Sequence, residues 1–235
     1  MKPGNRWGGM DIHKPKPWRG AGEFLKEIGT IVIGVLIALG AEQAVEQLHW
    51  AHEVRAARAA IRSEMAIANQ KFAFRVAAEP CIARRLDALE SVIERVARRE
   101  PVPRLGPVLP DVGNAFNEST WDNYRAAETL THFDGKEMAL LGTYYLQIGS
   151  MRQLVMSESD ALGVLAVLRG DPSRLGFADV ANLRVALQHA RFDNALIASI
   201  ASDELNGSKS LHLAVAAPDV ERLKTVCGPL PVVGV

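Results

Sequence analysis

One spacing in this sequence is typical of metal chemistry. Glu46-x-x-His49 has the separation that carboxylate-bridged di-iron bundles use, and Glu42 and Glu53 fall on the same helical stripe because residues three and four apart are neighbours. Such a centre needs a second motif on a facing helix, and the sequence has no other Glu-x-x-His. We therefore expect no metal site and interpret the stripe as a hydrated polar face.

Signatures of nucleophilic and phosphate chemistry are absent from the sequence. It contains no Gly-x-Ser-x-Gly, no Ser-x-x-Lys and no glycine-rich phosphate loop. The histidines outside the stripe are scattered, and His189, on an expected long helix, is interpreted as a packed residue rather than a general base. We predict that the chain is not an enzyme and carries no cofactor.

Three aromatic residues are the candidates for a ligand pocket. Trp121, Tyr144 and Tyr145 fall on expected helices. They either line a cavity between helices or, as aromatic residues at helical spacing usually do, pack in a core. Both interpretations stay open at the level of sequence.

The charge balance bears on the kind of partner. Lys+Arg and Asp+Glu number 27 each, so the formal net charge is zero. Arginines are frequent between residues 55 and 99, but acidic residues alternate with them, which is typical of a hydrated helix surface. Without a basic patch, nucleic acid is not expected as a partner.

The two cysteines, Cys81 and Cys227, do not form a CxxC motif. In an oxidising compartment they can form one disulfide closing a long loop, which would stabilise the fold by about 2–4 kcal/mol. The alternative is two unpaired, packed thiols.

Residues 28–41 form an uncharged apolar run bounded by Glu27 and Glu42. This run is too short to cross a bilayer, but a helix over residues 24–45 would be about 33 Å long, enough for a hydrocarbon core of roughly 30 Å. We therefore predict an uncleaved single-pass anchor. Two alternatives are a signal peptide cleaved after Gly40 and a helix buried in a soluble core.

The flanks of the apolar run predict its orientation. Basic residues outnumber acidic ones in residues 1–23, so this tail is expected in the cytoplasm and residues 46–235 on the periplasmic side of a bacterial inner membrane. Within the span, Thr30, Gly34 and Ala38 form a small-xxx-small row that lets helices approach closely. This row predicts a lateral contact with a second copy or another membrane protein.

Apolar residues at steps of three and four predict an all-α fold, an up-and-down bundle of about four helices after the membrane helix. Pro80 is expected to end the first helix, and a second, amphipathic helix is expected from residue 82. Residues 100–117, with four prolines, are expected to form a connector.

Local signals mark where the later helices begin and end. Ser119 with Asp122 and Asp134 with Glu137 resemble capping boxes at two helix starts. The second of these helices is expected to reach Gly170, with a break near residues 157–159. A further long helix is expected to end at Gly207, and a short one to start at Pro218.

Two segments together carry a resemblance. GEFLKEIGTIVIGVLIAL near the start and ESTWDNYRAAETLTHFDGKEMALLGTYYLQI in the middle resemble a family of bacterial single-span membrane proteins of uncharacterised function. The resemblance implies an N-terminal anchor and a helical extracytoplasmic domain, and it implies no catalytic residues.

These patterns favour two functional hypotheses. The first is a membrane-anchored helical domain that acts by protein contact, as a scaffold or accessory subunit, with the lipid bilayer as its other partner. The alternative is a ligand-sensing bundle that acts through a signalling partner, because the cytoplasmic tail is too short to hold an output domain.

Overall fold

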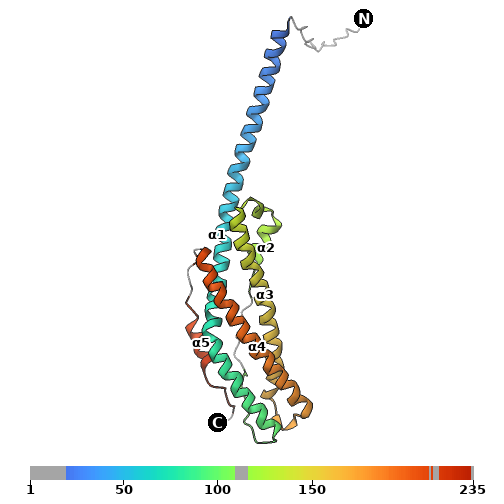
Figure 1. Ribbon diagram of the computed structural model, residues 1–235, viewed down its shortest axis with the longest axis vertical. Coiled ribbons are helices and arrows are strands. Elements are labelled where there is room, and N and C mark those ends of the chain that lie inside the picture. Colours follow the sequence, from blue (N-terminus) through green and yellow to red (C-terminus); the bar gives the residue numbers. More distant parts are fainter. Residues whose placement is uncertain (1–19, 109–115, 212, 214–216, 234–235) are drawn as a thin grey trace, which may run out of the picture. The chain divides into compact units, whose positions relative to one another are not determined.

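The computed structural model describes residues 20–108, 116–211, 213 and 217–233, and over these residues the fold is all-α, as predicted (Figure 1). The chain divides into two compact units, residues 1–51 and 52–235. The α-helices are α1 (Ala21–Ala97), α2 (Ser119–Ala126), α3 (Gly135–Leu165), α4 (Phe177–Gly207) and α5 (Val220–Cys227). Short 3-10 turns lie between several of them.

In the first unit, α1 contains one segment that is long and apolar enough to cross a membrane. None of the residues in this apolar window is buried. The exposed large apolar side chains in this unit include Ile28, Ile31, Val32, Ile33, Val35, Leu36, Ile37 and Leu39. Of the predicted basic tail, residues 1–19 lie outside the described residues.

The prediction that Pro80 ends the first helix is wrong, because α1 continues through this residue to Ala97. Proline removes one backbone hydrogen bond and strains the preceding turn, at a cost of about 3 kcal/mol. The ring of Pro80 is exposed, while Ala78 and Ile82 on either side of it are buried in the core. Burial of the flanking turns therefore offsets the local cost.

The described residues of the second unit form three long helices, rather than about four, because the segments before and after Pro80 are one helix. Ion pairs show the helix directions. Arg58 and Arg75 of α1 contact Glu137 and Glu158 of α3 in the same order, so α1 and α3 run parallel. Glu94 pairs with Arg184, whereas Asn194 contacts Arg75 further back along α1, so α4 is antiparallel.

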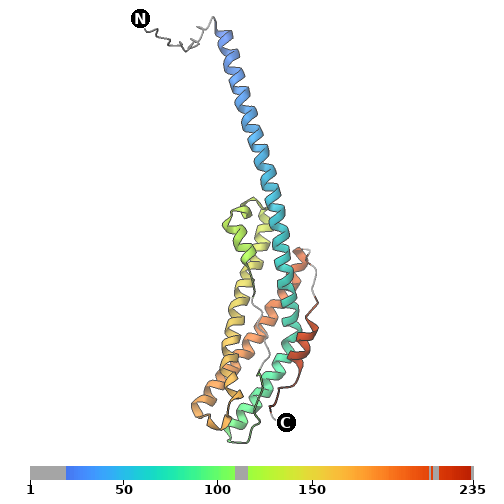
Figure 2. The same cartoon turned by 180° about the vertical axis from the view of Figure 1, so that it is seen from behind.

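The parallel direction of α3 depends on the connector that follows α1. After α1 ends, the described residues that precede α3, 98–108 and 116–134, include α2, which lies beside α3 (Figures 1 and 2). The predicted connector at residues 100–117 belongs to this stretch, and its residues 109–115 lie outside the described residues. The bundle is therefore not a simple up-and-down succession of helices.

The core of the second unit consists of two hydrophobic clusters. One cluster takes its α1 side chains from Val54 to Phe72, and the other takes them from Phe74 to Val96. On α3 the division lies between Val155 and Ala161, and on α4 it lies between Ala190 and Ile197. Buried polar residues occupy the level of this division on all three helices, namely Arg75, Glu158, Asp193 and Asn194.

Residues 217–233 form a segment that we call the C-terminal strap. It contains α5, and its Cys227 forms a disulfide with Cys81 of α1, the pairing that the sequence left open. Beyond α5, Val232 forms an isolated β-bridge with Leu105. In both views α5 lies beside α1 (Figures 1 and 2).

Candidate functional site

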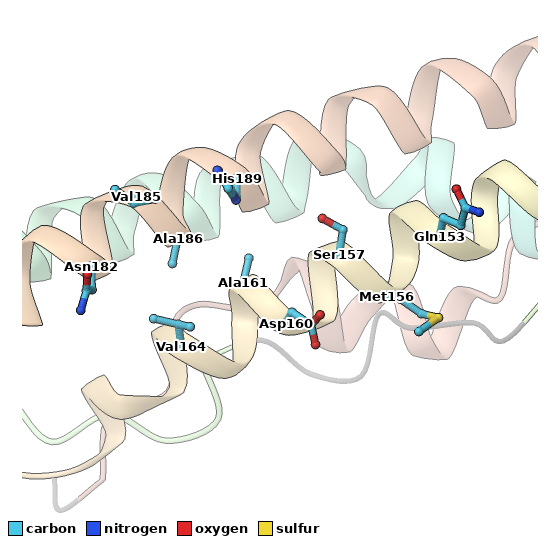
Figure 3. A pocket seen from close by; sticks show the side chains of 10 residues that line it. All are labelled: Gln153, Met156, Ser157, Asp160, Ala161, Val164, Asn182, Val185, Ala186 and His189. Atoms are coloured by element: carbon cyan, nitrogen blue, oxygen red, sulfur yellow. The ribbon is translucent and has the colours of Figure 1, made fainter.

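A groove of about 710 Å³ lies between α3 and α4. Figure 3 shows side chains from both helices along it, with Ala161 of α3 and Ala186 of α4 pointing toward one another. The lining residues are Gln153, Met156, Ser157, Asp160, Ala161, Val164, Asn182, Val185, Ala186 and His189. We call this feature the α3–α4 groove.

The α3–α4 groove combines a floor of small residues with apolar edges. Ala161 and Ala186 are buried, whereas the side chains of Met156 and Val185 are 63% and 58% exposed. Small residues at facing positions leave space between two helices, and the exposed apolar side chains border this space. The prediction that His189 is a packed residue is wrong, because His189 is exposed and lines the groove.

One groove residue connects the surface to the buried polar layer. The hydroxyl of Ser157 donates a hydrogen bond to Oδ2 of Asp193 at 2.8 Å, and Asp193 is only 4% exposed. The floor of the groove is therefore held by a contact between α3 and α4 that does not depend on apolar packing.

Arg75 and Glu158 form a buried ion pair beneath the groove. Nη2 of Arg75 lies 2.8 Å from Oε1 of Glu158, and the two side chains are 1% and 2% exposed. The same Nη2 donates to Oδ1 of Asn194 at 3.4 Å, and Nδ2 of Asn194 donates to the carbonyl of Glu79 at 3.3 Å. Burial raises the pKa of Glu158, while the charge of Arg75 opposes this rise.

The predicted pocket aromatics pack in the core. Trp121, Tyr144 and Tyr145 are 7%, 3% and 4% exposed. The rings of Trp121 and Tyr145 stack with centroids 4.6 Å apart, and Tyr144 meets Tyr145 edge-on at 5.6 Å. The rings thus fill the space between their helices, which is the second of the two interpretations that the sequence left open.

Glu64 is a buried carboxylate that links three helices. Its Oε1 accepts a hydrogen bond from the hydroxyl of Tyr145 at 2.8 Å, and its Oε2 accepts one from the backbone N–H of Thr120 at 2.9 Å. Thr120 is at the start of α2, where free backbone N–H groups favour a negative charge. A side chain of α1 therefore stabilises the beginning of α2.

The capping boxes predicted from the sequence have different outcomes. At α2 the predicted Ser119–Asp122 box is wrong, because the N-cap residue is Glu118 and no cap side chain accepts a hydrogen bond. At α3 the start is confirmed, since Asp134 accepts hydrogen bonds from the backbone of Lys136 and Glu137. The side chain of Glu137 bonds Arg58 instead of closing the box.

Helix lengths follow the sequence pattern with small differences. The predicted break near residues 157–159 is absent, and α3 ends at Leu165 before a 3-10 turn rather than at Gly170. The predicted end of α4 at Gly207 is confirmed. The short last helix begins at Val220 with Asp219 as its cap, two residues after the predicted start.

A second polar cluster lies near the end of α4. Oδ1 of Asn69 accepts hydrogen bonds from the hydroxyls of Ser208 at 2.9 Å and Tyr144 at 3.3 Å. Close to this cluster, burial and the neighbouring charge of Asp203 raise the pKa of Glu204 to about 7. Glu204 therefore changes its charge near neutral pH.

The predicted packing row and the polar stripe lie on α1. Thr30, Gly34 and Ala38 are exposed, and the hydroxyl of Thr30 donates to the carbonyl of Lys26 at 2.9 Å. Within the described residues, no His, Cys, Asp or Glu side chains gather in threes to hold a metal. The spacing of Glu46 and His49 is therefore not part of a larger ligand set in this part of the chain.

Sequence reasoning missed the buried polar residues, although a signal for them exists. Glu64 lies three residues after the buried Ile61, and Arg75 lies three residues after the buried Phe72. Glu158 likewise lies three residues after Val155. Polar residues in register with an apolar stripe are thus the sequence signal for this layer.

Fold and geometry together define a helical domain that follows a candidate membrane helix. No family model, curated protein or solved structure matches this chain. The resemblance to a family of single-span membrane proteins therefore remains a prediction from the residues that carry it.

The buried ion pair can be tested by a double-mutant cycle. We expect Arg75→Met or Glu158→Leu alone to lower the free energy of unfolding by about 3–5 kcal/mol, because each leaves an uncompensated buried charge. The double variant should recover most of this loss. Urea unfolding of the full chain in detergent, followed by circular dichroism, measures the effect.

The exposed Arg184–Glu94 pair, 48% and 40% exposed, provides the control for this cycle. It also joins α1 to α4, and Arg184→Met should cost no more than about 1 kcal/mol. Additive losses at Arg75 and Glu158 would contradict the assignment of a coupled buried pair.

The raised pKa of Glu204 predicts that the free energy of unfolding depends on pH. Its pKa of about 7 in the folded state lies above the ordinary value of 4.5, so the folded state holds the proton more tightly. Its contribution is present below pH 4.5 and is lost as the pH rises through about 7. Glu204→Gln should flatten this part of the unfolding free-energy profile, whereas the exposed Glu221→Gln should leave the profile unchanged.

Proposed function

We propose that this protein is a membrane-anchored helical interaction protein, acting as a scaffold or accessory subunit rather than as an enzyme. Residues 24–45 would span the bilayer, and the helical unit from His52 onward would bind another protein. The observation that carries this proposal is the apolar window of α1, in which no residue is buried. When lipid covers such a helix, its apolar side chains leave water, and this transfer is favourable.

The disulfide and the charge flanks support one orientation. Disulfides persist in oxidising compartments, and Cys81 and Cys227 both belong to the second unit. The excess of basic residues before the span favours a cytoplasmic N-terminus. Both arguments favour a single-pass protein of the bacterial inner membrane whose helical unit faces the periplasm.

The α3–α4 groove is the surface that we assign to protein contact. Met156 and Val185 expose apolar surface along it, and the exposed polar side chains of Asn182 and His189 also line it. Protein contact sites commonly combine an apolar centre with polar groups that define the orientation of the partner. Met156 is also unbranched and flexible, which suits a surface that adapts to a partner.

The membrane helix offers a second contact surface. A Cβ placed on Gly34 would meet no atom within 4 Å, and the row of Thr30, Gly34 and Ala38 is exposed. Small residues at this spacing allow two helix backbones to approach in a bilayer. We assign this row to contact with a second copy or with another membrane protein.

The volume of the α3–α4 groove favours one alternative function, ligand sensing through a signalling partner. Its volume of about 710 Å³ lies in the range of small-molecule sites, roughly 300–1,000 Å³. A small metabolite that raises the melting temperature of the protein, with Ala161→Leu abolishing the rise, would favour this alternative.

The topology predicts the result of fractionation. After an alkaline wash, the full-length protein should remain in the membrane pellet with an intact N-terminus, because an integral helix resists extraction. Protease added to spheroplasts should digest the helical unit. Release of a soluble chain that begins at Ala41 would instead show that the apolar run is a cleaved signal peptide.

The groove predicts the result of crosslinking in native membranes. We expect Met156→Glu to reduce partner crosslinks at least tenfold, because a buried unpaired carboxylate at a contact costs more than about 1.4 kcal/mol. Leu146→Glu is the matched control, since Leu146 is also on α3 and is 71% exposed, outside the groove. Equal crosslinking of the two variants would contradict the assignment of the groove.

A further inference from the structure

The two sulfurs of the Cys81–Cys227 disulfide have different surroundings. Cys81 lies within α1 and is 8% exposed, whereas Cys227 is the last residue of α5 and is exposed. A thiolate that approaches from solvent therefore meets Cys227 first. Attack on a disulfide sulfur requires access to that sulfur, so the difference in exposure favours attack at Cys227.

Arg84 lies beside the other sulfur. Its Nη2 donates a hydrogen bond to Sγ of Cys81 at 3.1 Å. A guanidinium at this distance stabilises negative charge on sulfur, and a stabilised thiolate is the better leaving group. Cys81 is therefore suited to leave when Cys227 is attacked.

The position of Cys227 adds to this asymmetry. The C-terminal end of a helix carries partial negative charge from its free carbonyl groups, which disfavours a thiolate there. Arg85 donates to carbonyls at this end of α5 and just after it, those of Thr225, Val226, Gly228 and Pro229. The guanidinium of Arg85 is thus engaged with the backbone, while that of Arg84 contacts the Cys81 sulfur.

We propose that the Cys81–Cys227 disulfide is a thiol–disulfide exchange site for a dithiol protein, with Cys227 as the attacked sulfur and Cys81 as the leaving thiolate beside Arg84. The inference rests on the difference in exposure between Cys81 and Cys227 and on the contact of Arg84 with the Cys81 sulfur. It does not depend on the proposed scaffold role.

The exchange consists of two displacements. A thiolate of the dithiol attacks Sγ of Cys227, a new S–S bond forms, and the bond to Cys81 breaks with its electron pair on Cys81. The second thiolate of the dithiol then attacks its own partner sulfur and releases Cys227. The dithiol is oxidised to a disulfide, and the two cysteines, reduced by two electrons in total, take up one proton each.

Contacts other than the disulfide hold the C-terminal strap, so the reduced cysteines stay near each other. Arg85 binds the carbonyls at the end of α5, and Val226 is fully buried. Further along, Gly106 donates to the carbonyl of Pro231 at 2.8 Å, and Val233 donates to that of Arg104 at 2.9 Å. The reverse reaction can therefore restore the disulfide without refolding of the strap.

Mapping of the mixed disulfide tests the direction of attack. The oxidised full-length protein in detergent is mixed with reduced glutathione, quenched with N-ethylmaleimide and mapped by mass spectrometry. We expect glutathione on Cys227 and maleimide on Cys81 of the same chain. Glutathione mainly on Cys81, or no reaction under conditions where the urea-unfolded protein reacts, would overturn the proposal.

The rate of reduction by dithiothreitol tests the role of Arg84. Arg84→Gln should slow the reduction roughly threefold, because the leaving sulfur loses a neighbouring positive charge, and Arg84→Lys should restore most of the rate. Arg62→Gln, an exposed change elsewhere on α1, is the control and should react like the unaltered protein. Equal rates for Arg84→Gln and Arg62→Gln would overturn the assignment of Arg84.

Discussion

The buried contact between Arg75 and Glu158 is the interaction on which the arrangement of the helical unit depends. Both side chains are almost fully removed from solvent, so neither charge is tolerated without the other. A pair of this kind forms at one register of α1 against α3, and the contact of Arg75 with Asn194 extends the requirement to α4. Apolar stripes alone would permit one helix to shift by a turn with little loss, whereas this layer penalises the shift. We therefore regard the polar layer as the element that specifies register.

The polar layer also explains why the core has two parts. The cluster that contains Phe72 and the cluster that contains Phe74 meet at the level of Arg75 and share no residue. On the outer side of the layer, Ser157 bonds Asp193 at the floor of the α3–α4 groove. The surface that we assign to protein contact is thus supported by a residue of the same polar layer, Asp193. A contact surface built on fixed helices loses little conformational entropy when a partner binds.

The C-terminal strap is held in a different way. A covalent bond to Cys81, the carbonyl contacts of Arg85 and a single bridge at Val232 act together on one short segment. The covalent bond restricts the unfolded chain, since it closes a loop across a sequence separation of 146 residues. The non-covalent contacts act only in the folded state. The non-covalent contacts can therefore keep the C-terminal strap in place when the disulfide is reduced.

The sequence by itself determined the apolar segment of α1, the all-α class, the start of α3 and the end of α4, because periodicity and caps such as Asp134 are local properties of the chain. It did not determine the continuity of α1 through Pro80, the N-cap of α2 at Glu118, or the hydrogen-bond partners of Glu64. Only the tertiary structure decided these features, together with the parallel direction of α3 and the pairing of Cys81 with Cys227. The physical reason is that each depends on groups far apart in the chain: burial offsets the cost of a proline, and a charge accepts burial only where its partner lies.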